Sequence, residues 1–85
     1  MTSAEAMEEY LRLAYEDGNP KMIQLALAAI ARAQNMTALA KKTGISRVGL
    51  YKALDTNNSP EHATIQNLVN ALGIKLQPVM VKAAA

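Results

Sequence analysis

The residues best suited to chemistry lie in one short stretch, TGISRVGLYKAL, which runs from Thr43 to Leu54. Its outward polar candidates are Ser46, Arg47, Tyr51 and Lys52. No acidic residue stands among them. An arginine can grip the O6 and N7 atoms of guanine with two hydrogen bonds, and hydroxyl groups suit other base edges. The stretch is therefore typical of an element that enters the major groove of DNA.

Five helices are predicted around this stretch, because apolar residues recur at helical spacing between turn signals. Their expected ranges are about 3–17, 20–33, 37–43, 47–55 and 60–72. The residues expected to cap the second, third and fourth helices are Asn19, Thr37 and Ser46. The expected fold is an all-α bundle of the helix-turn-helix kind, in a single domain over residues 1–85.

The third and fourth helices have the spacing of a helix-turn-helix over about residues 37–55. Ala40 lets two helices approach closely, Gly44 makes the sharp turn, and Leu50 plugs the core. Val48 adds methyl groups that suit thymine to the outward face. Gly49 costs roughly 1 kcal/mol inside a helix relative to alanine. Either a close approach to the partner helix or to DNA, or mere tolerance, would account for that glycine.

A C-terminal arm of about residues 74–82 follows the last predicted helix. Ile74 to Val81 alternates well enough to be a strand, but Pro78 cannot donate to a ladder. We expect either a strand that pairs with the same segment of a second subunit or an extended arm that lies on the helices.

The composition limits the class of protein. A chain of 85 residues, 51% hydrophobic and 19% charged, predicts a folded domain too small for a large enclosed active site. The absence of cysteine, of a basic leader and of a long apolar run predicts a cytoplasmic protein with no membrane segment. Asp55, Ser59 and the single histidine, His62, bracket a loop without an oxyanion motif. We therefore expect no enzymatic activity, no metal and no cofactor.

Charge is distributed unevenly along the chain. Residues 1–17 contain five acids and one base, a charge of −4, whereas residues 18–54 contain no acid. This segregation predicts a polyanion-binding face and a separate acidic face. The alternative is that ordinary solvated charges happen to segregate.

Residues Thr37 to Leu54 resemble the helix-turn-helix of the Cro/C1-type (XRE) repressors. The longer run from Tyr10 to Leu76, with EDGNP at 16–20 and ALGIKL at its end, looks like the addiction-module antidote proteins, HigA-like antitoxins of that class. The resemblance implies a homodimer that binds a palindromic DNA operator, represses its own operon and neutralises a co-encoded RelE/HigB-like toxin. Val48 stands where relatives often carry a polar or acidic residue, which concerns the base preference.

The resemblance also assigns individual residues to these contacts. It implies base-edge contacts by Ser46, Arg47, Tyr51 and Lys52. It implies phosphate contacts by Thr37, Lys41, Lys42, Asn57 and Asn58. A threonine at a helix N-terminus can offer its hydroxyl and a backbone N–H to a phosphate. For the two lysines, the role of ordinary solvated side chains is an equal alternative.

The acidic first helix is expected to contact the toxin, because toxins of the implied class are basic ribonucleases. The candidate contacts are Glu5, Glu8 and Glu9. The alternative is that these are solvated acids placed favourably near a helix N-terminus.

Two other functions compete: a stand-alone phage-type repressor without a toxin, and a helical adaptor that binds protein. The acid-free window of residues 18–54 argues against the adaptor.

Overall fold

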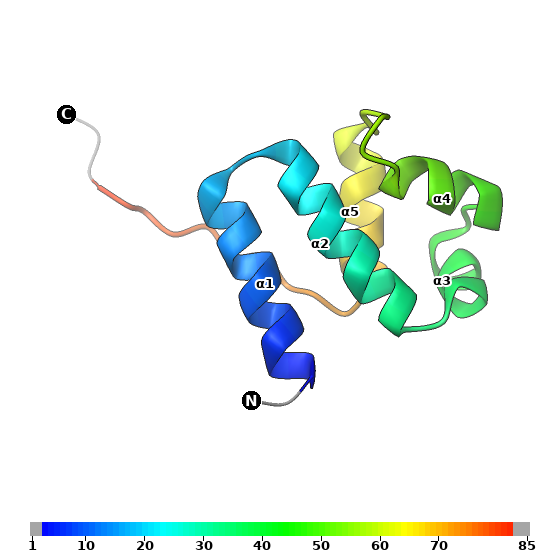
Figure 1. Ribbon diagram of the computed structural model, residues 1–85, viewed down its shortest axis with the longest axis horizontal. Helices are drawn as coiled ribbons and strands as arrows, with labels where there is room; N and C mark the ends of the chain where they lie inside the picture. Colours follow the sequence, from blue (N-terminus) through cyan, green and yellow to red (C-terminus); the bar gives the residue numbers. More distant parts are fainter. Residues whose placement is uncertain (1–2, 83–85) are drawn as a thin grey trace.

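Five helices make up the part of the chain described by the computed structural model, residues 3 to 82 (Figure 1). They are α1 (Ser3–Asp17), α2 (Pro20–Ala33), α3 (Met36–Thr43), α4 (Arg47–Leu54) and α5 (His62–Ala71). The all-helical prediction is confirmed over these residues, and α1 and α2 have the expected bounds. Residues 1, 2 and 83–85 of the expected domain lie outside the described part.

The helices pack around α2. Helix α1 lies along one side of α2, α3 and α4 lie on the other, and α5 packs against α3 (Figure 1). The largest fully buried side chains are Leu27 of α2, Leu50 of α4, and Leu68 and Val69 of α5. Burying one such side chain contributes about 1.5–3 kcal/mol. The position of α4 is therefore fixed through the same core that holds α2 and α5.

Side-chain caps set the starts of three helices. Asn19 caps α2 by accepting a hydrogen bond from the Lys21 N–H at 2.9 Å, with Pro20 in the first helical position, as predicted. Helix α3 is capped by Asn35, which accepts from the Ala38 N–H at 3.1 Å. The prediction that Thr37 caps this helix is therefore wrong. Asparagine ranks at least as high as threonine at this position, and the extended backbone of Asn35 lets the helix begin at Met36.

The ends of α4 and α5 differ slightly from the prediction. Helix α4 ends at Leu54, one residue early, because Asp55 has extended backbone and its carboxylate accepts from the Asn57 N–H at 2.9 Å. Helix α5 begins at His62, after the extended residue Glu61, and not at Pro60. The loop between the two helices is therefore longer than expected.

The turn between α3 and α4 is held by hydrogen bonds within the turn and by one hydrogen bond from α5. Gly44 has a φ of 74°, the left-handed conformation that glycine adopts without strain. The Thr43 hydroxyl donates to the Leu39 carbonyl at 2.9 Å and accepts from the Ile45 N–H at 3.1 Å. From α5, the Asn67 side-chain amide donates to the Thr43 carbonyl at 2.9 Å. These bonds fix the angle at which α4 leaves α3.

The C-terminal arm, residues 74–82, contains no β-strand; of the two expected forms, the single chain shows the extended arm and gives no support to the strand. A strand needs a second strand for its backbone hydrogen bonds, and the described residues supply none. Ile74 is half-buried against the core, and the arm continues beside α1 (Figure 1). A groove of about 560 Å³ separates the arm from α1.

Candidate nucleic-acid interface

Helix α4 presents most of the predicted base-edge residues on its solvent side. Arg47, Tyr51 and Lys52 are exposed, and Val48 beside them is 65% exposed. The opposite side carries the buried residues Leu50, Ala53 and Leu54. These side chains are exposed on the side of α4 that the sequence analysis expects to face outward. A helix with one such face has the dimensions and the donors to enter a major groove.

Ser46 has a structural task in addition to the predicted one. Its hydroxyl oxygen accepts a hydrogen bond from the Gly49 N–H at 3.0 Å and so caps α4, as the sequence predicts. The hydroxyl proton stays available as a donor. A contact of Ser46 with a nucleic acid can use this proton, or the second lone pair of the oxygen, while the bond from Gly49 holds the helix start.

The close approach of the turn before α4 to the first turn of that helix explains the glycine at position 49. A Cβ atom at this position would lie 2.8 Å from Ile45 Cγ2 and 3.2 Å from Ser46 Oγ. The first distance is too short for two carbon atoms in contact, which prefer about 3.5–4.0 Å. The glycine lets the turn before α4 fold tightly against the first turn of that helix.

Gln24 of α2 holds the far end of α4, and the sequence prediction missed it. It is 3% exposed, and its side-chain amide nitrogen lies 3.0 Å from the Ala53 carbonyl, 3.3 Å from the Asp55 carbonyl and 3.1 Å from the Asn58 carbonyl. A buried amide is stabilised when its N–H groups meet backbone acceptors, here the Ala53 carbonyl at the end of α4 and two carbonyls of the following loop. The sequence does contain a signal for this buried role, because Gln24 lies on the apolar stripe of α2, three residues before Leu27.

The two predicted asparagine contacts have different surroundings. The Asn58 side chain donates to the Lys52 carbonyl at 2.9 Å, and the Asn58 carbonyl accepts from Lys21 Nζ at 2.9 Å. This residue therefore helps to close the loop onto α4. Asn57 is exposed, with its backbone N–H bonded to the Asp55 carboxylate. Of the two, Asn57 keeps the more accessible side chain.

Helix α3 and the end of α2 extend the basic surface. Thr37, Lys41 and Lys42 are exposed on α3. Arg32, in the last turn of α2, lines a hollow of about 230 Å³ together with Tyr51 of α4. The sequence prediction did not include Arg32, because α2 and α4 come together only in the folded chain.

The cations of this surface carry no compensating partner inside the described chain. Within residues 3–82, no ion pair involves Arg32, Lys41, Lys42, Arg47 or Lys52. Unpaired cations on one face attract polyanions and exclude acidic surfaces. The surface formed by α3, α4 and the end of α2 is called the basic face below.

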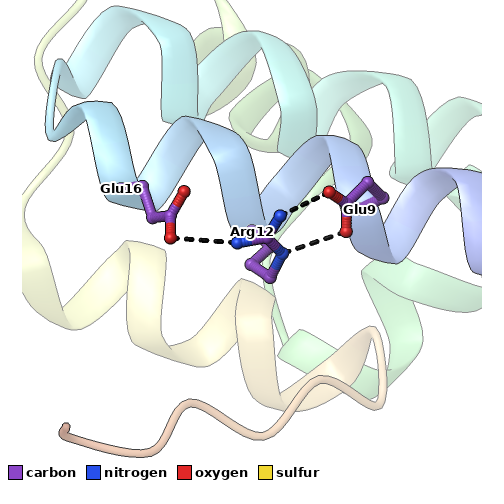
Figure 2. A network of polar contacts seen from close by, with 3 residues as sticks. All are labelled: Glu9, Arg12 and Glu16. Atoms are coloured by element: carbon purple, nitrogen blue, oxygen red, sulfur yellow. Dashed lines mark hydrogen bonds and ion pairs between the residues drawn. The ribbon is translucent and has the colours of Figure 1, made fainter.

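The acidic residues of α1 include a local ion-pair network. Arg12 contacts Glu9 and Glu16 one turn away on either side, with 2.9 Å from its Nη1 to Glu16 Oε1 (Figure 2). The hydrogen bond from Arg12 lowers the pKa of the Glu9 carboxyl, and the same bond and the charge of Glu16 raise the pKa of Arg12. Among the predicted toxin contacts, the charge of Glu9 is thus partly compensated, whereas Glu8 forms no ion pair within residues 3–82.

Residues 3–82 contain neither a candidate metal site nor a candidate membrane span. No group of three or more histidine, cysteine or carboxylate side chains is arranged to hold a metal ion there. No helix in this range has the length and apolar character needed to cross a membrane.

Comparison with known proteins gives two matches. A family model described as "Probable addiction module antidote protein" matches residues 1–80. An uncharacterised protein of Haemophilus influenzae is 42% identical over 77 residues, which cover 91% of this chain and 79% of the relative. No solved structure matches the chain.

Proposed function

Because the chain belongs to the family of probable addiction module antidote proteins, we propose that it is the antitoxin of a type II toxin–antitoxin module. In this proposal it acts in the cytoplasm as a homodimer without enzymatic activity, binds a palindromic operator of its own operon, and neutralises a RelE/HigB-like toxin. The observation that carries the DNA-binding part is the basic face, on which α4 holds its exposed Arg47, Tyr51 and Lys52.

The geometry supports DNA binding by more than charge. Helix α4 is held at both ends, by the Ser46 cap and by the Gln24 side chain, so its exposed residues have a fixed position. A preorganised recognition element loses less conformational entropy on binding. Phosphate contacts by α3 would set its register, and base contacts by α4 would provide sequence specificity.

The toxin-binding part rests on the family and on the charge of α1. Membership of an antidote family implies a cognate toxin in general. Residues 1–17 carry a charge of −4, which would complement a basic toxin and steer its association. Helix α1 lies on the opposite side of α2 from α4 (Figure 1). In this proposal, DNA and toxin therefore bind different sides of the molecule.

The decisive experiment expresses the adjacent small reading frame in cells, with and without this protein, and then purifies the two together. We expect growth to stop with the neighbour alone and to resume when this protein is present as a stable complex. If the neighbour is harmless and does not co-purify, the antitoxin proposal is wrong and a stand-alone phage-type repressor becomes the better reading.

A charge-reversal variant then tests α1 as the toxin contact. Glu5→Lys combined with Glu8→Lys should weaken toxin capture by roughly tenfold or more, because two attractive rim charges become repulsive. The matched control is Glu61→Lys, a reversal at an exposed residue before α5. DNA affinity should not fall in the double variant. Equal loss of both activities would indicate misfolding and would contradict a toxin-specific role of α1.

A further inference from the structure

The end of the C-terminal arm is unusually apolar for a solvent-exposed segment. Val79 is 79% exposed, Met80 is 82% exposed and Val81 is 96% exposed. In the described part of the chain, residues 75–82 form no backbone hydrogen bond. An extended segment with free backbone groups and exposed apolar side chains is suited to pairing with another strand.

Pro78 limits how such a pair can form. In an antiparallel pair, positions that exchange two backbone hydrogen bonds alternate with positions that exchange none. Pro78 has no N–H and must occupy a position of the second kind. The hydrogen-bonding positions then fall on Lys75, Gln77, Val79 and Val81, all of which have a backbone N–H.

The same alternation separates the side chains into two faces. Ile74, Leu76, Pro78 and Met80 lie on one face of an extended arm, and all four are apolar. Two copies of residues 74–82 overlap along their whole length when Pro78 faces Pro78 of the second copy. In that register Leu76 lies opposite Met80 of the second copy, on the apolar face.

A pocket is present where that apolar face meets the helices. Its volume is about 320 Å³, and its apolar walls include Tyr15, Ile23, Ile65 and Leu76. Burial raises the pKa of the Tyr15 phenol above its ordinary value. Because Leu76 lines the pocket, the side chain opposite Leu76 in a paired arm would reach the same place.

We propose that two copies of this chain join through their C-terminal arms, paired antiparallel about Pro78, with Met80 of each copy seated in the pocket of the other. The inference specifies the interface of the homodimer in the proposed function and rests on it. A two-stranded ribbon alone is marginal in water. Packing of its apolar face into two pockets supplies the burial that the ribbon lacks.

A second copy is the occupant that fits best, because the register is symmetric. In this register each chain contributes the same proline position, the same apolar face and the same pocket to the contact, as a two-fold interface requires. The opposite face of the ribbon carries Lys75 and Gln77 at one end and Val79 and Val81 at the other. The two valines line the groove between the arm and α1.

Cysteine cross-linking of the isolated protein tests the register, since the native chain has no cysteine. In the Pro78→Cys variant the two Cα atoms would be about 4.5 Å apart, as in a pair without backbone hydrogen bonds, which is within the range for a disulfide. We expect rapid formation of a covalent dimer on mild oxidation. The control is Lys75→Cys, whose two copies would be offset by about 20 Å along the ribbon and should not cross-link. Equal cross-linking of both variants would overturn the register.

Sedimentation tests the role of Met80. Met80→Asp should raise the dimer dissociation constant by about tenfold or more, because a buried apolar side chain is lost. The control Leu13→Asp changes an exposed apolar residue of α1, outside the arm, and should leave the dimer intact. Circular dichroism checks that each variant keeps its helices. A wild-type monomer, or an unchanged Met80→Asp dimer, would overturn the proposal. Both readouts omit DNA and toxin, so failure of the arm contact is distinguishable from failure of the proposed function.

Discussion

Neighbouring residues in α4 perform different physical tasks. Arg47 and Lys52 leave their charges in solvent, whereas Ser46 and Gly49 shape the start of the helix. A change at the first pair should therefore alter DNA binding, and a change at the second pair should alter stability. This separation makes single substitutions informative.

Arg47→Ala should weaken binding to the specific operator by about 1–3 kcal/mol if its guanidinium grips a guanine. The measurement is a titration of operator DNA at fixed salt. Lys82→Ala removes an equal charge outside the basic face and serves as the control. Unchanged affinity of the Arg47 variant would contradict a base contact by this residue.

Gly49→Ala should lower the free energy of unfolding by about 1 kcal/mol. Alanine has the better helix propensity by roughly 1 kcal/mol, but its Cβ would lie 2.8 Å from Ile45 Cγ2 and force the turn to move. Overpacking of this kind costs about 1–3 kcal/mol. Denaturant unfolding measures the difference. A variant that is more stable than the wild type would show that the turn can relax at little cost.

Helix α4 is positioned chiefly by contacts from other elements. Its hydrophobic side joins the core through Leu50, its N-terminus is set by the bonded turn after α3, and its C-terminus is held by Gln24 of α2. These contacts come from three helices, so the orientation of α4 depends on the whole bundle.

Gln24→Ala should lower the free energy of unfolding by about 1–3 kcal/mol, because the buried Ala53 carbonyl loses its side-chain donor. Operator affinity should fall as well, since the end of α4 and the loop after it lose their anchor. The control is Gln66→Ala, where the lost bond is to the side chain of Asn70 on the helix surface. Equal effects of the two substitutions would show that Gln24 has no special role.

At the scale of the molecule, the two kinds of charge lie on different sides of α2. Helix α1, which carries most of the acids, lies on one side of α2, and α3 and α4, which carry most cations of the basic face, lie on the other (Figure 1). Such separation orients an approaching polyanion toward α4 and away from α1.

The dependence of operator affinity on salt measures how many phosphates the basic face neutralises. A plot of log affinity against log salt should fall with a slope of about −0.9 for each neutralised phosphate. Replacing Lys41 by alanine in a dimer should reduce the magnitude of the slope by about 2 if it contacts a phosphate in each half-site. A flat salt response in the wild type would remove the DNA-binding proposal.

Local signals in the sequence were sufficient for most of the helices. Asn19, Gly44 and Ser46 act within a few residues of themselves, through a side-chain cap or a left-handed backbone, so their effects can be predicted without the fold. The outward position of Arg47 and Lys52 follows in the same way from the helical period. The prediction chose Thr37 and not Asn35 as the cap of α3 because both residue types suit a helix N-terminus and the two lie only two positions apart.

The contacts that fix the candidate site were decided by tertiary structure. Gln24 lies 29 residues from Ala53 along the chain, and no local period reveals that its amide meets the end of α4. The approach of Arg32 to Tyr51 has the same origin. The arm has no strand in the single chain because backbone pairing needs a partner strand. Which segment lies beside the arm depends on the tertiary or quaternary structure and not on the residues next to it in the sequence. The sequence by itself therefore determined which residues α4 exposes, and the packing of α2 against α4 determined how firmly they are held.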